Sequence, residues 1–312
     1  MRRVITILLL SFALFATTDV MAQKFSREDA KYVKQLTKSA KKGSSVVDIR
    51  DLADIYYYGT NAERDMTAAV KWYTKAAEMG DAYSQCMLAS CYYMGLGVEQ
   101  DLYLAAYWFQ LSAEQGMREA QHNLAICYLK GAGVDYDIEM AKYWYQQAAV
   151  QGCVDSQRMM GAIYSSVYED YVESIKWYTM AAEGGDMESQ NEVALQHLTG
   201  DYIPQDYATA VRWWSEAAGQ GHALANFNLG YCYHHGLGVD ANIDEAINRY
   251  RIAADAGVAI AQYQLGLCYL AGEGVEQDVY LSLEWLRIAG DNGYDMAWAV
   301  IAEVEAVLER EE

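Results

Sequence analysis

Proline is nearly absent from this chain. Pro204 is the only one among 312 residues, whereas hydrophobic residues make up 53% of the sequence and aromatic residues 13%. Proline interrupts a helix because it lacks a backbone N–H and its ring collides with the preceding turn. Its scarcity, combined with the high apolar content, favours helices that pack along their whole length and argues against a disordered chain.

Basic residues are scarce relative to acidic ones. The chain has 23 Lys and Arg against 43 Asp and Glu, which gives a formal net charge of −20. A field of this sign repels phosphate backbones, so we expect no nucleic-acid partner. An acidic surface also keeps a long repeat array soluble, and the charge therefore does not by itself indicate a basic ligand.

Long apolar runs are confined to the N-terminus. Two arginines precede an apolar run at residues 4–16, and a segment with small residues then ends at Ala22. This order is typical of a secretory signal peptide over residues 1–22, cleaved after Ala22. A membrane anchor is the alternative, but the run is shorter than the roughly 20 residues that a span needs. We expect export to the periplasm or the cell exterior, without membrane insertion after cleavage.

The six cysteines show no disulfide pattern. Four of them share one position of a repeating unit, and isoleucine stands there in other units, which favours apolar packing. Equivalent positions of neighbouring helical units lie about 8–10 Å apart, whereas a disulfide needs Cα atoms closer than about 7 Å. We expect free, mostly buried thiols, with the state of Cys86 and Cys153 left open. The four are Cys91, Cys127, Cys232 and Cys268.

Clusters for catalysis or metal binding are also missing. The five histidines do not have the spacing of a metal site. The nearest candidate is the pair His234 and His235, but adjacent residues of a helix point about 100° apart. The acidic residues are interpreted as helix caps and solvent-facing charges. We therefore predict no enzyme, no metal and no cofactor.

What the chain does contain is a tryptophan that returns at a fixed interval. Trp72, Trp108 and Trp144 are 36 residues apart, Trp177 follows after 33 residues, and Trp213 after another 36. A fixed period of about 20–50 residues indicates a solenoid, in which one supersecondary unit is stacked many times. The tryptophans are expected to lie in the core.

Each unit is predicted to contain two helices, and the second one has a regular start and end. In the second unit it begins at Asp101, continues with Ala105 and Trp108, and ends before Gly116. Asp is a strong N-cap because its side-chain oxygen accepts a bond from an orphaned backbone N–H. The glycine ends the helix in a left-handed conformation.

The first helix of each unit carries one apolar stripe. In the second unit Leu88 is followed by the small Ala89 and, four residues after the leucine, by Tyr92. This spacing places all three on one buried face. A Gly-x-Gly-Val segment, residues 95–98 in this unit, then makes a tight turn into the second helix.

Seven units fit between residues 44 and 292. Residues 23–43 are predicted to form an N-terminal capping helix with a capping box of Ser26 and Asp29, and residues 293–312 a C-terminal capping helix. The fourth unit is three residues short, and the fifth has residues 200–204 in place of the glycine turn. We expect a local change in superhelix curvature there, with a loop variation of no consequence as the alternative.

The complete pattern resembles the Sel-one-like repeat, a relative of the tetratricopeptide repeat. The resemblance implies an all-α, right-handed α/α superhelical solenoid of about seven two-helix repeats that acts as an adaptor for a protein or peptide partner. Cysteine-rich members of the family pair cysteines between the helices of a repeat, and this chain lacks that pairing. The second unit shows the pattern at Ala82, Gln85, Leu88, Tyr92, Gly95, Gly97, Val98, Asp101, Ala105, Trp108, Ala113 and Gly116.

Candidate binding residues are those that the repeat pattern does not dictate. If the helices are arranged as in tetratricopeptide arrays, the first helices line a concave face. The groove is then faced by the positions two before, two after, five after and six after the leucine. Aromatic residues among them are typical peptide anchors; burial against neighbouring helices is the alternative. The predicted partner-binding residues are Tyr93, His122, Arg158, Asn191, Phe227, Tyr231, His234 and Tyr263.

The sequence thus predicts an exported, monomeric, non-enzymatic scaffold that holds a protein or peptide partner in a concave groove. Two alternatives stay open. One is a cell-envelope enzyme, or a subunit of one, that acts on a cell-wall component. The other is a structural spacer without a specific ligand.

Overall fold

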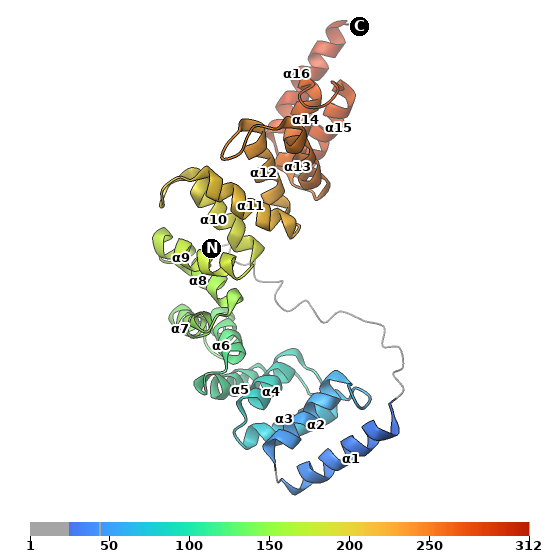
Figure 1. Ribbon diagram of the computed structural model, residues 1–312, viewed down its shortest axis with the longest axis vertical. Helices are drawn as coiled ribbons and strands as arrows, with labels where there is room; N and C mark the ends of the chain where they lie inside the picture. Colours follow the sequence, from blue (N-terminus) through green and yellow to red (C-terminus); the bar gives the residue numbers. More distant parts are fainter. Residues whose placement is uncertain (1–24, 44, 312) are drawn as a thin grey trace. The chain divides into compact units, whose positions relative to one another are not determined.

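A computed structural model describes residues 25–43 and 45–311, so the predicted signal peptide lies outside the described residues. The described chain is entirely helical (Figure 1). In chain order its helices are α1 (Arg27–Lys42), α2 (Val46–Tyr58), α3 (Met66–Glu78), α4 (Ala82–Met94), α5 (Leu102–Glu114), α6 (Arg118–Lys130), α7 (Ile138–Val150), α8 (Val154–Ser166), α9 (Tyr171–Glu183), α10 (Met187–Thr199), α11 (Tyr207–Gly219), α12 (Ala223–His235), α13 (Ile243–Asp255), α14 (Ala259–Ala271), α15 (Val279–Asp291) and α16 (Met296–Glu311).

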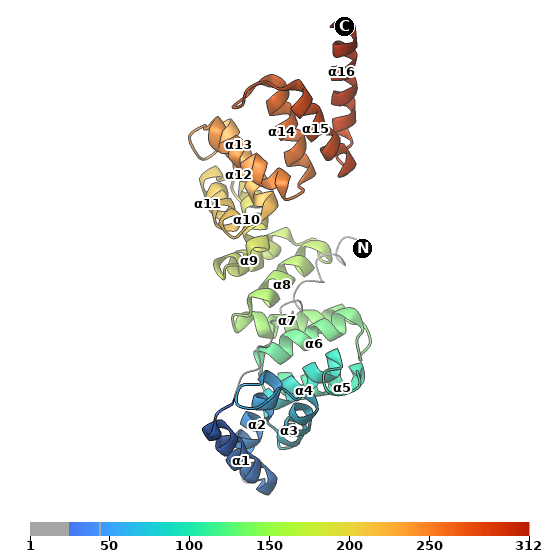
Figure 2. The ribbon, with the colours of Figure 1, turned by 90° about the vertical axis from the view of Figure 1, so that its right-hand side faces the viewer.

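The helices form two compact units, residues 25–160 and 161–311, and the boundary lies within α8. In the first unit each helix from α1 to α7 packs on the next one, and in the second unit each helix from α9 to α16 does so (Figures 1 and 2). The even-numbered helices α2 to α14 are the first helices of seven repeats, here called A helices. The odd-numbered helices α3 to α15 are the second, here called B helices. This solenoid-like order confirms the predicted all-α repeat fold.

The B helices begin at the predicted caps. The side chain of the residue before each helix accepts a hydrogen bond from a backbone N–H of the first turn, at 2.9–3.1 Å. The capping box at Ser26 and Asp29 is also present. Local side-chain chemistry therefore decides where these helices start. The seven caps are Asp65, Asp101, Asp137, Asp170, Asp206, Asn242 and Asp278.

The core follows the predicted stripes. The leucine position of every A helix and the small residue of every B helix are buried, which lets the helices approach closely. The tryptophan column is largely core, as predicted: Trp72, Trp144, Trp177 and Trp213 are buried, whereas Trp108 is half-buried. Each repeat is stabilised chiefly by this apolar contact with its neighbours.

The Gly-x-Gly turns pack on the preceding repeat. A Cβ added at Gly97 would lie 2.3 Å from the carbonyl of Met66, and one at Gly133 would lie 1.9 Å from the carbonyl oxygen of Leu102. Both glycines also have positive φ, 71° and 75°. Only glycine tolerates both the close approach and the positive φ. The second glycine of the turn therefore lets each loop pack against the start of the previous B helix.

A chain of glutamines links neighbouring repeats. Near the start of α6, the Gln121 amide donates to the carbonyl of Ala113 at the end of α5, at 3.2 Å. The Gln121 amide oxygen in turn accepts a bond from Gln151, beyond the end of α7, at 2.7 Å. The same two-step link recurs at Gln85, Gln190 and Gln262. Each of these carbonyls also accepts the backbone N–H of the glycine that ends the helix, so the glutamine supplies a second hydrogen bond and joins two repeats.

All six cysteines are free thiols, and five of them are buried, in line with the prediction. Burial raises the pKa of the thiols at Cys86, Cys91, Cys127 and Cys232 to about 12. These side chains therefore stay protonated near neutral pH and pack as small apolar groups.

The short fourth repeat turns from α8 into α9 without the glycine motif. Glu169 supplies the positive φ of this turn, 55°, which is the only positive φ of a non-glycine residue in the described chain. At the start of α9, Tyr171 stacks on Tyr202 of the next loop, with ring centroids 4.4 Å apart. The change in superhelix curvature expected near this point stays a prediction.

Candidate functional site

The eight predicted binding residues lie on A helices and differ widely in exposure. Asn191 and Phe227 are buried, at 4% and 9% exposed, whereas Tyr231 is 40% exposed. The remaining five are half-buried: Tyr93, His122, Arg158, His234 and Tyr263.

Two predicted residues of α12, Tyr231 and His234, lie together with two residues that were not predicted, His235 and Tyr250. Tyr231 lies against His235, with ring centroids 4.3 Å apart. His234 and His235 stack at 4.6 Å with an interplanar angle of 10°, although neighbouring helical positions diverge. The hydroxyl of Tyr250 from α13 lies 3.3 Å from His234 Nδ1. The result is a partly exposed cluster of rings at the end of α12.

This ring cluster has one acidic neighbour. His234 Nε2 lies 3.0 Å from a carboxylate oxygen of Glu273, in the turn after α14. Burial, followed by the nearby His234, lowers the pKa of His235, and the charge of Glu273 opposes that shift. His235 is therefore neutral near pH 7, and the cluster offers flat aromatic faces together with ring nitrogens for hydrogen bonds.

Three other predicted residues of the second unit make packing contacts. Phe227 belongs to the core between α12 and α14 and lies 5.7 Å from the Tyr250 ring. Asn191 accepts bonds from the Trp214 indole at 3.0 Å and from Asn228 at 3.2 Å. Tyr263 lies 4.8 Å from Tyr294. For Phe227 and Asn191 the alternative of burial against neighbouring helices describes the side chain better than a groove-facing position.

His122 of the first unit lies in a second polar group. Its Nδ1 is 2.8 Å from the Ser156 hydroxyl and 3.9 Å from the Cys153 sulfur. Burial is the largest effect on its pKa and lowers it, so the ring is neutral. Arg158, also predicted, pairs with Asp155 one turn earlier on α8, at 3.4 Å.

Tyr93 packs beside the B helix of its own repeat. Its ring centroid is 6.4 Å from that of Phe109 on α5. Burial raises the pKa of its hydroxyl, which stays protonated at neutral pH. Tyr93 thus fills the space between α4 and α5 with its ring.

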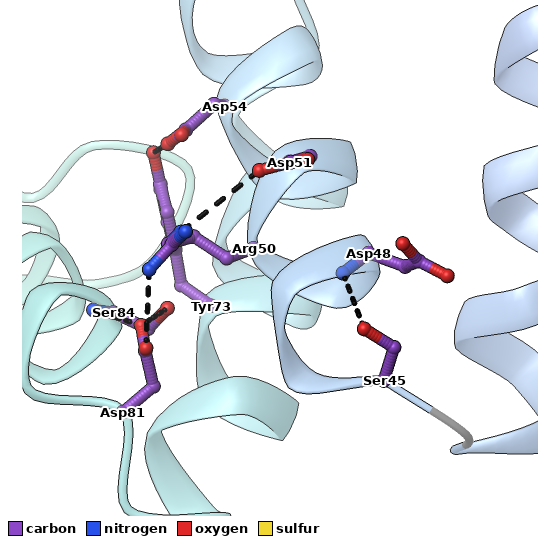
Figure 3. Close-up of polar contacts among 8 residues, drawn as sticks. All are labelled: Ser45, Asp48, Arg50, Asp51, Asp54, Tyr73, Asp81 and Ser84. Carbon is purple, nitrogen blue, oxygen red and sulfur yellow. Dashed lines mark hydrogen bonds and ion pairs between the residues drawn. The ribbon is translucent and has the colours of Figure 1, made fainter.

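A polar group on the A helix of the first repeat was not predicted residue by residue. Arg50 of α2 pairs with Asp81, the cap of α4, at 3.4 Å (Figure 3). The Arg50 guanidinium also lies 5.8 Å from the centre of the Tyr83 ring. One turn further along α2, Asp54 accepts a 2.5 Å bond from the Tyr73 hydroxyl of α3. An arginine, two carboxylates and two tyrosines therefore converge from three helices.

The Asp54 carboxyl, at the centre of this group, is subject to opposing effects on its pKa. Burial raises the pKa of Asp54, while hydrogen bonds from Tyr73 and Tyr83 and the charge of Arg50 oppose the shift. Burial and the hydrogen bond to Asp54 raise the pKa of the Tyr73 hydroxyl far above its usual range. Such perturbed groups are common at binding sites, although structural ion-pair networks also show them.

A signal for this first-repeat group was available in the sequence. Arg50, Asp54 and Tyr58 stand two before, two after and six after Leu52. The first two positions are those that place His122 and Tyr231 on the list of predicted residues, and the position six after the leucine was also predicted to face the groove. Applying the position rule to the first repeat would have identified all three.

Within residues 25–43 and 45–311, no group of three or more His, Cys, Asp or Glu side chains is placed to hold a metal ion. Among the helices of those residues, none combines the length and apolarity needed to cross a membrane.

The sequence profile of the Sel1 repeat matches seven consecutive segments of this chain. They cover most of the helical array and coincide with the A–B helix pairs. The matched residues are 49–81, 82–117, 118–153, 154–186, 188–222, 223–258 and 259–294.

Two solved structures are similar over most of the chain. One is c5321, a protective antigen present in uropathogenic Escherichia coli strains and displaying an SLR fold. It is 29% identical with a TM-score of 0.79, and the match covers 87% of this chain but only 59% of that one. The other is a Sel1 repeat protein from Oxalobacter formigenes, 28% identical with a TM-score of 0.62, covering 76% of this chain and 94% of that one. Among curated proteins, no match was found.

Proposed function

This chain belongs to the Sel1 repeat family, and on that premise we propose that it is an exported, non-enzymatic scaffold that holds a peptide or protein partner against its A helices. The partner makes contact with the side chains that vary from repeat to repeat, chiefly those of α2 and α12. The repeated leucine, tryptophan and small residues pack the core and do not contact the partner.

One observation carries this proposal: equivalent A-helix positions hold chemically different side chains, whereas the core positions around them hold similar residues in every repeat. Two residues after the buried leucine position, the first repeat has Asp54 and the sixth has Tyr231. A position with the same packing task in every repeat would favour one kind of residue, as the leucine position does. Side chains that vary from repeat to repeat on a constant core are expected of an extended surface that contacts successive parts of a partner.

The exposed aromatic residues of these positions are suited to anchor a partner. Tyr58 at the end of α2 is 51% exposed and Tyr231 is 40% exposed. Tyrosine supplies a large contact area and a hydroxyl with little loss of side-chain entropy, which is why it is enriched among binding hot spots. Asp54 stands one turn before Tyr58 on α2 and Arg50 one turn before Asp54, and both add polar groups for a partner's backbone.

Export is supported by the sequence of residues 1–22. Cleavage after Ala22 would leave a mature chain that begins at Gln23. Mass spectrometry of protein expressed from the full gene should find this N-terminus. A mature chain that retains Met1 would contradict export through a cleaved signal.

A peptide-display selection on the purified protein tests the scaffold function. Peptides selected by the native protein should bind either Tyr58→Ala or Tyr231→Ala about 30-fold more weakly, depending on the unit that they contact, which corresponds to about 2 kcal/mol for a hot-spot aromatic. The controls are Tyr103→Ala on α5 and Tyr280→Ala on α15, since both tyrosines are about three-quarters exposed (78% and 75%) and lie on B helices. Equal losses in the control pair, or no selected peptide at all, would contradict the proposal.

A further inference from the structure

A cavity of about 130 Å³ lies between the end of α8, α9 and α10. Its walls include Ser165, Tyr171 and Tyr178 on one side and Glu192 and Gln196 of α10 on the other. All of these residues belong to the second compact unit. A volume near 150 Å³ is enough to take up a benzene-sized group, so this cavity has room for the end of one long side chain.

The cavity exists because one position of the repeat is occupied by a small residue. Ser165 stands five residues after the leucine position, where the other six repeats have large side chains. In the second repeat this position is Tyr93, whose ring fills the space beside Phe109; Phe109 is the counterpart of Tyr178. The other occupants of the position are Tyr57, Tyr93, Leu129, Leu198, His234 and Leu270.

A polar residue on α10 faces this space where the other repeats are apolar. Gln196 occupies the position held by cysteine or isoleucine in all other repeats. Its side-chain oxygen Oε1 is fully buried and has no hydrogen-bond partner. Leaving a buried acceptor without a partner costs about 1–3 kcal/mol, and a cysteine here would avoid that cost. A glutamine at this place is therefore unfavourable for packing alone.

The second acceptor is the Glu192 carboxylate. No hydrogen bond or ion pair within the described residues involves this half-buried side chain. Burial, followed by the charge of Glu188, raises the pKa of Glu192, and His222 opposes the shift. A partly buried carboxylate without a counter-charge destabilises the free protein, because desolvation of the charge is not offset.

The two serine hydroxyls of the lining already donate to backbone carbonyls. The Ser165 hydroxyl donates to the Ala162 carbonyl at 3.1 Å, and the Ser174 hydroxyl donates to the Gly161 carbonyl at 2.8 Å. Both donors are thus used within the protein, and the lining includes no lysine or arginine among the described residues. A ligand suited to this cavity brings hydrogen-bond donors and positive charge.

We propose that this cavity binds the cationic end of a lysine side chain of the partner polypeptide. The ammonium group donates to the Glu192 carboxylate and to Gln196 Oε1, and its methylene chain lies between the rings of Tyr171 and Tyr178. Tyrosine faces also attract cations. This assignment rests on the proposed scaffold function and specifies one side chain of the partner.

Titration with n-butylammonium chloride, followed by NMR of the ¹⁵N-labelled protein, tests the cavity directly. The probe reproduces the end of a lysine side chain, and 1-butanol is its neutral counterpart. We expect a saturable shift of the Gln196 side-chain amide signal with butylammonium and none with butanol. Equal shifts with the two probes, or no saturable shift, would overturn the assignment.

Three variants make this test more specific. Ser165→Tyr installs the side chain found in the first two repeats and should abolish butylammonium binding, whereas Ser165→Ala keeps the cavity and should retain it. Glu192→Gln should weaken binding about tenfold or more, because it removes the charged acceptor. If Ser165→Tyr does not fold, the Glu192→Gln titration decides, and unchanged affinity there overturns the assignment.

The experiments distinguish an error in the lysine assignment from an error in the proposed scaffold function. Displayed peptides that bind native protein and Ser165→Tyr equally well, with the same preference for lysine, overturn the lysine site and leave the scaffold function standing. If no peptide is selected by the native protein, the scaffold function is contradicted. The butylammonium titration still shows whether the cavity binds an alkylammonium group.

Discussion

At the scale of single residues, aromatic side chains at the positions predicted to face the groove are either buried or exposed, and their neighbours decide which. Phe227 and Tyr231 lie one helical turn apart on α12. Phe227 is enclosed by α13 and α14, whereas Tyr231 lies at the surface beside His235. Aromatic character alone therefore does not identify a binding residue in this chain.

Replacing Phe227 should affect stability rather than binding. We expect Phe227→Ala to lower the free energy of unfolding by about 3–5 kcal/mol, since it empties a core site. Tyr231→Ala should change it by about 0.5 kcal/mol or less, as is usual at an exposed site. Urea denaturation followed by circular dichroism measures both. A near-zero effect at Phe227 would place that side chain at the surface.

The carboxyl of Glu192 should make stability depend on pH. Its pKa is raised in the folded protein, so between the ordinary value and the raised one the folded state holds the proton more tightly, and stability falls as pH rises. Glu192→Gln should therefore raise the melting temperature at pH 7. The gain should vanish as pH is lowered below the ordinary glutamate pKa. A variant less stable than native at pH 7 would refute the unfavourable charge.

At the scale of elements, helix starts were predictable because each depends on residues close in sequence. The B-helix caps and the terminating glycines stand where the sequence pattern placed them. The glutamine links were not predicted, because each joins side chains and carbonyls up to 30 residues apart in sequence. The burial of Asn191 could not be predicted either, since it depends on the Trp214 indole of the next helix.

The cap of α6 offers a direct test of the capping contribution. Met117 precedes this helix in the same backbone conformation as Asp81 before α4, but it makes no side-chain cap bond. Met117→Asp should add about 1 kcal/mol of stability, and Asp81→Ala should remove a similar amount. Chemical denaturation measures the two changes. If Met117→Asp is destabilising, helix start and cap are not coupled here.

The glutamine links should contribute measurably to the contact between repeats. Gln121→Met keeps the length of the side chain but leaves the Ala113 carbonyl and the Gln151 amide without this partner. The Ala113 carbonyl keeps its bond from the Gly116 N–H, so we expect a loss of about 0.5–1.5 kcal/mol in the free energy of unfolding, typical of one hydrogen bond. Gln110→Met, on the exposed side of α5, is the control and should be neutral. Equal effects of the two substitutions would show that the link adds nothing.

At the scale of the whole molecule, each repeat is stable only through its neighbours. Deleting residues 118–153, which form one complete repeat of the first unit, removes a hairpin and one interface between hairpins. Because stability in such arrays is a sum of repeat and interface contributions, the shortened protein should fold but melt at a lower temperature. Differential scanning calorimetry measures this, and an unchanged melting temperature would contradict the repeat-by-repeat coupling.

The central claim is that a partner lies along the A helices, and photo-crosslinking tests it most directly. A peptide selected by display would carry a photoreactive phenylalanine analogue, and the crosslinked residues would be identified by mass spectrometry. We predict crosslinks on the even-numbered helices, concentrated at α2 and α12 near Tyr58 and Tyr231. Crosslinks confined to the exposed tyrosines of the B helices, such as Tyr103 and Tyr280, would contradict the claim.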